Sequence, residues 1–269
     1  MSRSETTAPS PGLYSETVEK LRTRIHAHTA YANVKLEDLL RDVLGPCDGS
    51  RLVELGCGSG NLFPAHAAAL GTTGLIIGLD KDRKLLDEAQ EGAKTLTTPS
   101  VLLHWDFDVH PYPLLDEDVD ILIAPFSAYY TNDIEAWIDD GLRLLRAKGR
   151  MILLGPTKDN ARELADLNEK VSGLRSVPET DETAAKLEDE LLPALRRREE
   201  LEVTSTVLDR RIVFPTAEEY ARYYLATWLC TRTSARIGRT IEHDVVVAAA
   251  HESSLELGKQ IICIEARRP

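Results

Sequence analysis

Residues 51–61 read Arg-Leu-Val-Glu-Leu-Gly-Cys-Gly-Ser-Gly-Asn, and this stretch decides the fold. Its apolar start predicts a short buried strand, and glycines then follow at every second position as Gly56, Gly58 and Gly60. Glycine lets the backbone adopt positive φ and approach a ligand closely. A helix that begins after such a loop directs unpaired N–H groups toward that ligand. The stretch therefore predicts a loop that holds a nucleotide-like molecule.

Acidic residues follow the next two predicted strands. Residues 74–80 form a buried strand that ends in Asp80, where a carboxylate can accept hydrogen bonds from both hydroxyls of a ribose. A strand over residues 101–104 leads to Asp106 and Phe107, whose carboxylate and ring suit the edge and face of an adenine. Dinucleotide-binding folds use a related G-x-G-x-x-G loop, but here the third glycine comes one residue earlier and Glu54 precedes the first.

Taken together, these residues resemble the class I S-adenosylmethionine-dependent methyltransferases, over about residues 24–157. The resemblance implies that the glycine loop lies along the methionine and ribose of the cofactor S-adenosylmethionine. It also implies that Asp80 binds the ribose, that Asp106 and the N–H of Phe107 bind the adenine, and that a leader segment covers the sulfonium. The cofactor-binding residues expected on this basis are Glu54, Gly56, Cys57, Gly58, Gly60, Asn61, Asp80, Lys81, Asp106, Phe107, Pro125, Tyr31 and Asn33.

The order of predicted strands and helices indicates an α/β protein. Strands and helices alternate through residue 155, which predicts right-handed crossovers and a parallel sheet covered on both faces. The resemblance implies a doubly wound, mostly parallel, seven-stranded Rossmann-like sheet whose last strand, residues 259–265, is antiparallel. We expect a disordered tail over residues 1–13 and a single domain over 14–269. Within it we expect N-terminal helices at 14–45 and helical insertions at about 175–200 and 214–252 that form a cap, with 181–200 as a kinked surface helix.

Aromatic residues follow the fourth predicted strand, residues 119–124. Because open α/β sheets bind ligands at the carboxyl ends of their strands, the loop 125–131 should face the transferred methyl group. An aromatic face attracts a sulfonium or ammonium by about 1–2 kcal/mol when desolvated, although core packing is the alternative for each ring. A helix at 217–230 fits either a lid over the acceptor or a dimer interface. The expected substrate-binding residues are Phe126, Tyr129, Tyr220, Tyr224 and Trp228, and the expected catalytic residues are Tyr130, Tyr129 and His28, with His243 a further candidate base by residue type.

The segment 104–110 allows a competing hypothesis. If extended, it places two imidazoles and two carboxylates, those of His104, Asp106, Asp108 and His110, on one side, which suits a metal ion. Against this, the segment coincides with the expected adenine loop, and prolines at 111 and 113 disfavour a regular strand. We therefore expect no metal.

Composition narrows the range of partners. Lys and Arg number 32 against 44 Asp and Glu, so the formal charge is −12, which argues against nucleic acid as a substrate. The four cysteines have no C-x-x-C spacing, as is usual in a reducing cytosol. Neither a signal peptide nor a long apolar run is evident. We expect a cytoplasmic protein with a small-molecule substrate, no nucleic-acid or membrane partner, and a homodimer as an open possibility.

The expected function is S-adenosylmethionine-dependent methyl transfer to a small molecule. Methyl transfer from a sulfonium is an in-line displacement, so the protein mainly positions the reactants and excludes water, and a base is needed only for an acceptor that carries a proton. Three alternatives stay open. The sulfonium is itself the substrate of cyclisation or aminocarboxypropyl transfer that releases methylthioadenosine, the protein binds the cofactor without turnover, or it is a nicotinamide-dependent oxidoreductase.

Overall fold

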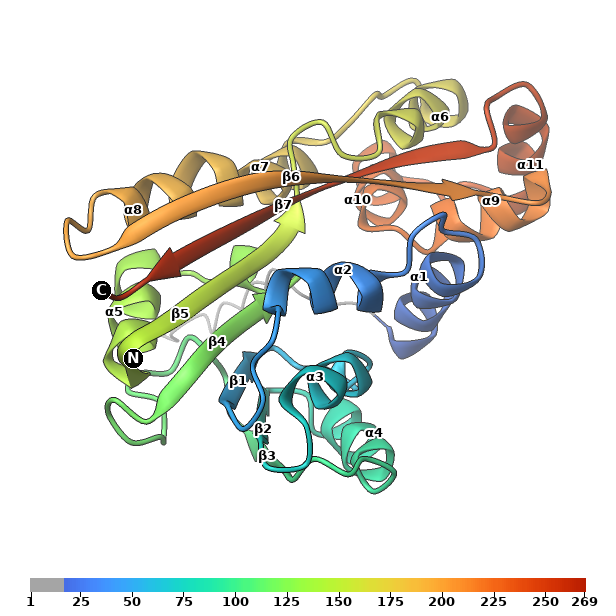
Figure 1. Ribbon diagram of the computed structural model, residues 1–269. Coiled ribbons are helices and arrows are strands. Elements are labelled where there is room, and N and C mark those ends of the chain that lie inside the picture. Colours follow the sequence, from blue (N-terminus) through green and yellow to red (C-terminus); the bar gives the residue numbers. More distant parts are fainter. Residues whose placement is uncertain (1–16) are drawn as a thin grey trace, which may run out of the picture.

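The computed structural model describes residues 17–269, so the tail expected over 1–13 lies outside the described residues. A seven-stranded sheet in the order β3-β2-β1-β4-β5-β7-β6 forms its centre (Figure 1). Neighbouring strands from β3 to β5 are parallel, whereas β7 is antiparallel to both β5 and β6, which confirms the predicted sheet. The strands are β1 (Arg51–Leu55), β2 (Leu75–Asp80), β3 (Ser100–His104), β4 (Val119–Pro125), β5 (Leu145–Pro156), β6 (Glu202–Val213) and β7 (Glu256–Arg267).

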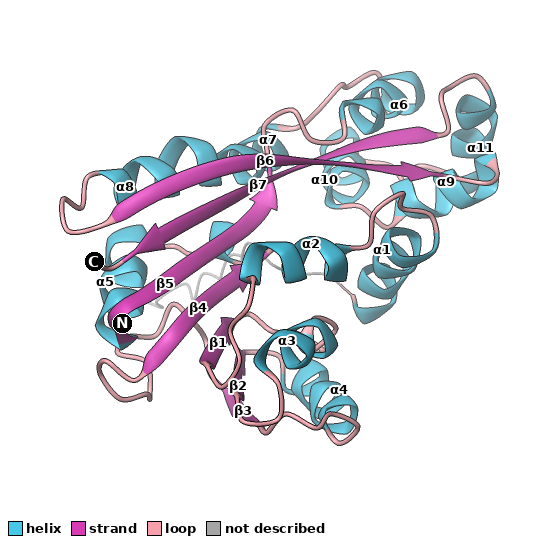
Figure 2. Ribbon diagram, viewed as in Figure 1, coloured by secondary structure: helices cyan, strands magenta, loops and turns pink. Residues whose placement is uncertain are grey.

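Helices cover both faces of the sheet (Figure 2). Successive strand residues point to opposite faces, so that Leu52 packs under α2, α3 and α4 while Val53 packs under α5 and α8. None of the described helices is both long and apolar enough to cross a bilayer. The helices are α1 (Val18–Ala30), α2 (Leu36–Leu44), α3 (Phe63–Leu70), α4 (Arg83–Ala93), α5 (Ile134–Leu144), α6 (Arg162–Ser172), α7 (Pro178–Lys186), α8 (Leu192–Arg196), α9 (Ala217–Leu225), α10 (Trp228–Ile237) and α11 (His243–His251).

A separate apolar cluster surrounds the far ends of β6 and β7, where these two strands run beyond the rest of the sheet (Figure 1). Residues of α1, α6, α9, α10 and α11 pack there against Ile212, Phe214 and Leu257. The single helix expected over 217–230 is instead two helices. Thr227 begins the second one, since its hydroxyl accepts the N–H of Cys230 at 3.2 Å.

The segment expected to be a surface helix is part of the core. Leu187, Leu191 and Leu195 are fully buried against the sheet face that α5 also covers, so this segment does not form a cap. Their spacing of four residues makes an apolar stripe, which the sheet buries while the charged residues face outward. The helix accommodates Pro193 through a π-helical turn at Leu187–Leu191.

Candidate functional site

The glycine loop follows β1 at the point where the strand order reverses. From β1 the chain proceeds to β2 and β3 on one side, and β4 then pairs with the other side of β1. Such a reversal leaves a crevice at the carboxyl ends of the strands, where α/β folds bind ligands. A cavity of about 850 Å³ opens there, and residues at the ends of β1, β2 and β4 line it.

The conformation of the loop requires glycine. Gly56, Gly58 and Gly60 have φ of +74°, +53° and +71°, as the sequence predicts. A Cβ atom at position 56 would lie 2.5 Å from Cβ of Ser127, which follows β4. The loop can approach β4 and the cavity this closely because no side chain intervenes.

Asp80 connects the loop to the end of β2. Its Oδ2 accepts the N–H of Gly58 at 2.7 Å, and its Oδ1 accepts the N–H of Asp82 at 2.8 Å. Burial raises the pKa of Asp80, and the two N–H donors offset this in part. The carboxylate also lines the cavity, where its remaining lone pairs suit the hydroxyls of a ribose.

Glu54 forms a buried pair with a histidine that the motif does not include. Oε2 of Glu54 lies 2.9 Å from Nε2 of His66 in α3, and the two residues are 2% and 0% exposed. Glu54 is also part of the cavity lining. The only sequence signal for His66 was an imidazole within an otherwise apolar helix.

The adenine segment is only partly as expected. Phe107 lines the cavity, and so does Lys81, but Asp106 does not. The Oδ1 of Asp106 accepts the N–H of Asp108 at 3.1 Å, and its Oδ2 lies 3.8 Å from Nζ of the cavity-lining Lys81. Asp106 thus lies next to the cavity lining, and its contact with the adenine stays a prediction.

The side chains considered as metal ligands are dispersed. His104 contacts the carbonyl of Lys81, Asp108 accepts from Thr131 and Asn132, and His110 contacts Asp140. Residues 17–269 contain no cluster of three or more His, Cys, Asp or Glu side chains suited to a metal ion.

The loop after β4 contributes aromatic side chains to the cavity. Pro125, Phe126, Tyr129 and Tyr130 all line it. Phe126 has φ of +58°, a strained value for a bulky residue, and its N–H donates to the carbonyl of Leu154 at 2.7 Å. The sequence did not indicate Ser127, whose hydroxyl donates to the Leu55 carbonyl at 2.5 Å and ties this loop to β1.

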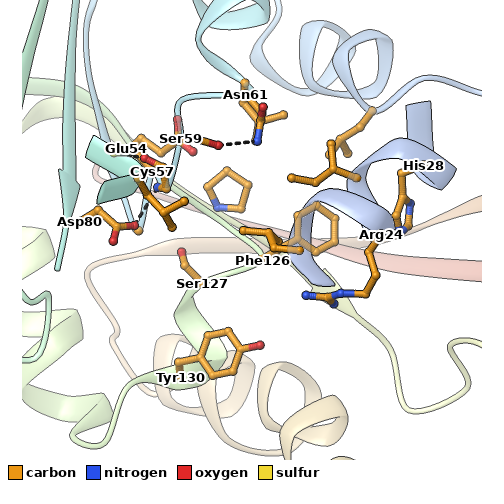
Figure 3. A pocket seen from close by; sticks show the side chains of 18 of the residues that line it. Arg24, His28, Glu54, Cys57, Ser59, Asn61, Asp80, Phe126, Ser127 and Tyr130 are labelled. Atoms are coloured by element: carbon orange, nitrogen blue, oxygen red, sulfur yellow. Dashed lines mark hydrogen bonds between the residues drawn. The ribbon is translucent and has the colours of Figure 1, made fainter. Parts of the chain in front are cut away.

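The opposite wall of the cavity comes from α1, α9, β6 and β7. Figure 3 shows Arg24 and His28 of α1 across the cavity from Glu54 and Asp80, with Phe126 between them. The strand residues Arg210 and Lys259 and the α9 residue Tyr223 also line this wall.

His28 lies between a cation and a hydroxyl. Nη1 of Arg210 is 3.4 Å from Nδ1 of His28, and the Tyr223 hydroxyl is 3.2 Å from Nε2. A guanidinium can only donate, so Nδ1 accepts and Nε2 carries the proton. Burial, and then the charges of Lys259, Arg210 and Arg24, lower the pKa of His28 well below its ordinary value, which keeps the ring neutral.

Two residues of the leader segment do not reach the cavity. The Tyr31 ring packs edge-on against Phe214, and the Tyr31 carbonyl accepts the N–H of Val213. Asn33 exchanges hydrogen bonds with Arg211, because its N–H donates to the Arg211 carbonyl and its Oδ1 accepts the Arg211 N–H. Both residues attach the leader to β6 and lie outside the cavity lining, and their contact with the cofactor stays a prediction.

The aromatic residues of α9 and α10 also differ from expectation. Tyr220 and Tyr224 are buried in the separate apolar cluster at the far ends of β6 and β7, where the Tyr224 hydroxyl donates to Asn168. Trp228 lies outside the lining, with its ring edge-on to Tyr130 and under the guanidinium of Arg232. Tyr223 is the one residue of 214–252 that lines the cavity, since the adjacent positions of an α-helix point in other directions. The candidate base His243 is exposed at the start of α11, away from the cavity.

Comparison with known proteins agrees with this geometry. Residues 52–149 match the family model of a methyltransferase domain. The chain is 26% identical over 124 residues to an uncharacterized 37.1 kDa protein in a Streptomyces fradiae transposon, covering 46% of this chain and 35% of that protein. It is 27% identical over 106 residues to a demethylmenaquinone methyltransferase of Lactobacillus johnsonii, covering 39% of this chain and 43% of that one. The chain thus spans less than half the length of these relatives.

Solved structures share the fold. A SAM-dependent methyltransferase from Aquifex aeolicus aligns with a TM-score of 0.58 and 12% identity, covering 94% of this chain and 100% of that one. A geranyl diphosphate C-methyltransferase from Streptomyces coelicolor aligns with a TM-score of 0.52 and 17% identity, covering 87% and 76%. Residues 52–149 thus resemble a methyltransferase domain, and the chain has the fold of the class I, Rossmann-like S-adenosylmethionine-dependent methyltransferases.

Proposed function

We propose that this protein transfers the methyl group of S-adenosylmethionine to a small-molecule acceptor. The observation that carries the proposal is that the ends of β1, β2 and β4 open on one cavity at the reversal of strand order, with Asp80 and the glycine loop in its lining. The family match over 52–149 and the fold support the same activity. Two of the relatives are named as quinone methyltransferases and one structural neighbour as a geranyl diphosphate methyltransferase, which favours a small acceptor.

The residues present fit the cofactor. The absence of a side chain at Gly56 lets the glycine loop pack against Ser127 after β4, and the half-buried Asp80 carboxylate would accept the ribose hydroxyls. Phe107 and Lys81 would border the adenine, and Glu54 with Cys57 and Asn61 would border the remaining part of the nucleoside and methionine. S-adenosylmethionine supplies an electrophilic methyl group when bound.

The chemical step needs few protein groups. A lone pair of the acceptor bonds to the methyl carbon while the carbon–sulfur bond breaks and its electron pair passes to sulfur, so S-adenosylhomocysteine remains. The protein holds the acceptor in line and excludes water, which the aromatic residues Phe126, Tyr129 and Tyr130 are placed to do. For an acceptor that must lose a proton, the proposed proton-receiving groups are Tyr129 or Tyr130 as a phenolate, and Nδ1 of His28 when it is released from Arg210.

The test is a product analysis. The full chain is incubated with S-adenosylmethionine and a metabolite extract, and the products are identified by mass spectrometry. We expect S-adenosylhomocysteine together with an acceptor heavier by one methylene. Methylthioadenosine as the product would contradict methyl transfer, and no product despite S-adenosylhomocysteine binding in calorimetry would contradict an enzyme. Binding of a nicotinamide dinucleotide in preference to S-adenosylhomocysteine would contradict the cofactor.

A further inference from the structure

On the acceptor side of the cavity, where Arg24 of α1 also lies, two further cations face each other across a strand pair. Arg210 of β6 and Lys259 of β7 are register partners in the antiparallel ladder, and both line the cavity. Like charges directly opposite on neighbouring strands destabilise a sheet. Within residues 17–269, no carboxylate lies within ion-pair distance of either side chain. The fold therefore keeps together two positive charges with no carboxylate in ion-pair contact among the described residues.

Arg210 is held in place by neutral groups alone. It is 2% exposed, and its Nε donates to the Val34 carbonyl at 2.8 Å. Nη2 donates to the His28 carbonyl at 3.3 Å, and Nη1 approaches Nδ1 of His28. These bonds connect the leader to β6, which gives the residue a structural role. They use three of five N–H donors and leave the buried charge unpaired, which costs several kcal/mol in a protein interior.

One acid, Glu37, lies on the same wall, and its charge acts on Arg210 from beyond ion-pair distance. Burial outweighs that attraction, so the pKa of Arg210 is lowered from its ordinary value. The Lys259 side chain makes no hydrogen bond to any residue from 17 to 269. An anion between the two side chains would remove both their mutual repulsion and the unpaired charge of Arg210.

The pair is placed for an acceptor rather than for the cofactor. In the sheet order β1-β4-β5-β7-β6, β7 is three strands from the glycine loop and β6 is four, or about 14 and 19 Å at ordinary strand spacing. Ile261 pairs with Pro156 at the end of β5, so Lys259, two residues away, lies beyond the edge where the cavity opens. The acids Glu54 and Asp80 lie on the other side, among the groups assigned to the cofactor.

We propose that the acceptor carries a carboxylate or phosphate group that binds between Arg210 and Lys259. This inference rests on the proposed methyl transfer and adds the chemical class of its substrate. The guanidinium of Arg210 would bind two oxygens of the anion. The ammonium of Lys259 would bind a third oxygen or the same two. His28 and the Tyr223 hydroxyl would border the bound anion. A net charge of −12 on the chain means that anions reach this wall by local rather than overall attraction.

The experiment uses the full chain saturated with S-adenosylhomocysteine and three small probes of similar shape. Benzoate and phenyl phosphate carry the anionic groups, and benzyl alcohol is neutral. Calorimetry or NMR titration at low salt should show tighter binding of at least one anion than of the alcohol, and the preferred anion identifies the group. Lys259→Met should lower the affinity for that anion by about tenfold or more, as expected for loss of one charge-assisted hydrogen bond. Lys259 is the residue to change because no hydrogen bond of the described fold depends on it.

Lys148→Met is the matched control, because Lys148 is exposed near the start of β5, at the end of the strand opposite to the cavity, and its loss changes the net charge equally. It should leave both anion and S-adenosylhomocysteine binding unchanged. Equal binding of all three probes would overturn the proposal. So would a parallel loss of S-adenosylhomocysteine affinity in Lys259→Met, which would assign the cations to the carboxylate of the cofactor. Failure of the unaltered protein to bind S-adenosylhomocysteine would instead count against the proposed function, and anion binding is measurable without it.

Discussion

The N–H of Gly58 donates a 2.7 Å hydrogen bond to Oδ2 of Asp80, which joins the glycine loop after β1 to the end of β2. The same carboxylate accepts the N–H of Asp82, so one side chain fixes the backbone on both sides of the expected ribose site. Asp80 therefore acts on ligand binding in two ways, through contact with the ligand and through the shape of the loop.

Asp80→Ala should weaken binding of S-adenosylhomocysteine by about 1.5–3 kcal/mol, or roughly 10- to 150-fold, the cost of losing hydrogen bonds to a charged group. Asp80→Asn keeps an acceptor for the Gly58 N–H and should lose less. Isothermal titration calorimetry measures both. If the alanine variant and the unaltered protein bound S-adenosylhomocysteine equally well, Asp80 would not be part of the binding site.

Gly56→Ala should destabilise the protein by about 1–3 kcal/mol, because the added Cβ has to occupy a position at φ of +74° and 2.5 Å from Cβ of Ser127. It should also abolish or severely weaken S-adenosylhomocysteine binding. Gly92→Ala is the matched control, since Gly92 lies within α4 with nothing within 4 Å of an added Cβ. Alanine there should stabilise the helix by up to about 1 kcal/mol. Urea unfolding followed by circular dichroism compares the two, and similar stability changes in both variants would contradict the steric explanation.

The two neighbouring tyrosines of α9 should separate a structural role from a role at the site. Tyr224→Phe removes the hydroxyl that donates to Asn168 and should lower the free energy of unfolding by about 1 kcal/mol or more, without changing turnover. Tyr223→Phe removes the hydroxyl beside His28 at the cavity wall and should alter turnover with a smaller effect on stability. Thermal unfolding and product formation are measured for both. If Tyr224→Phe lost turnover while it kept full stability, the result would show that Tyr224 acts at the substrate site.

Stability should depend on pH through His28. Its pKa in the folded protein lies well below the ordinary value because of burial and of the facing cations Lys259, Arg210 and Arg24, with the Tyr223 hydroxyl as its other polar neighbour. The unfolded chain titrates near about pH 6.5 and then binds more protons than the folded one, so the free energy of unfolding falls as the pH drops below that value. Above it the contribution of His28 is constant, because both states are neutral.

Urea midpoints at about pH 7.5 and about pH 5.5 measure this dependence, and His28→Gln should reduce the difference between them. His243→Gln should preserve the difference, since that imidazole is exposed at the start of α11. An unchanged difference in the His28 variant would show that this histidine is protonated in the folded state as readily as in the unfolded one.

Local patterns were sufficient for the centre of the fold. The alternation of apolar strands with amphipathic helices predicted the parallel sheet, and the positions of Gly56, Gly58 and Gly60 predicted positive φ at each, as observed. Asp80 and the loop after β4 reached the cavity because parallel strands end at one edge of a sheet. The strands, the glycine conformations and the position of Asp80 depend on residues that are close in sequence and on the rule that parallel strands end at one edge of their sheet.

Patterns of residue type were not sufficient for the direction of a side chain. Asp106 has the expected type and position, yet its carboxylate accepts the N–H of Asp108 and the residue is outside the cavity lining. Among the tyrosines of α9, the helical turn directs Tyr223 rather than Tyr220 or Tyr224 to the cavity. Arg210 did offer a signal, because it alternates with Leu208 and Ile212 on β6, which places a cation on the inner face of the strand.

The sequence by itself determined the parallel sheet, the glycine loop and the acid that supports it, because each follows from backbone conformation and from contacts within one strand–turn–helix unit. Only the tertiary structure decided which residues meet the acceptor. The wall of Arg210, Lys259, His28 and Tyr223 is assembled from β6, β7, α1 and α9, segments far apart in the chain. Their meeting depends on how those elements pack around the far ends of β6 and β7, which no short-range pattern encodes.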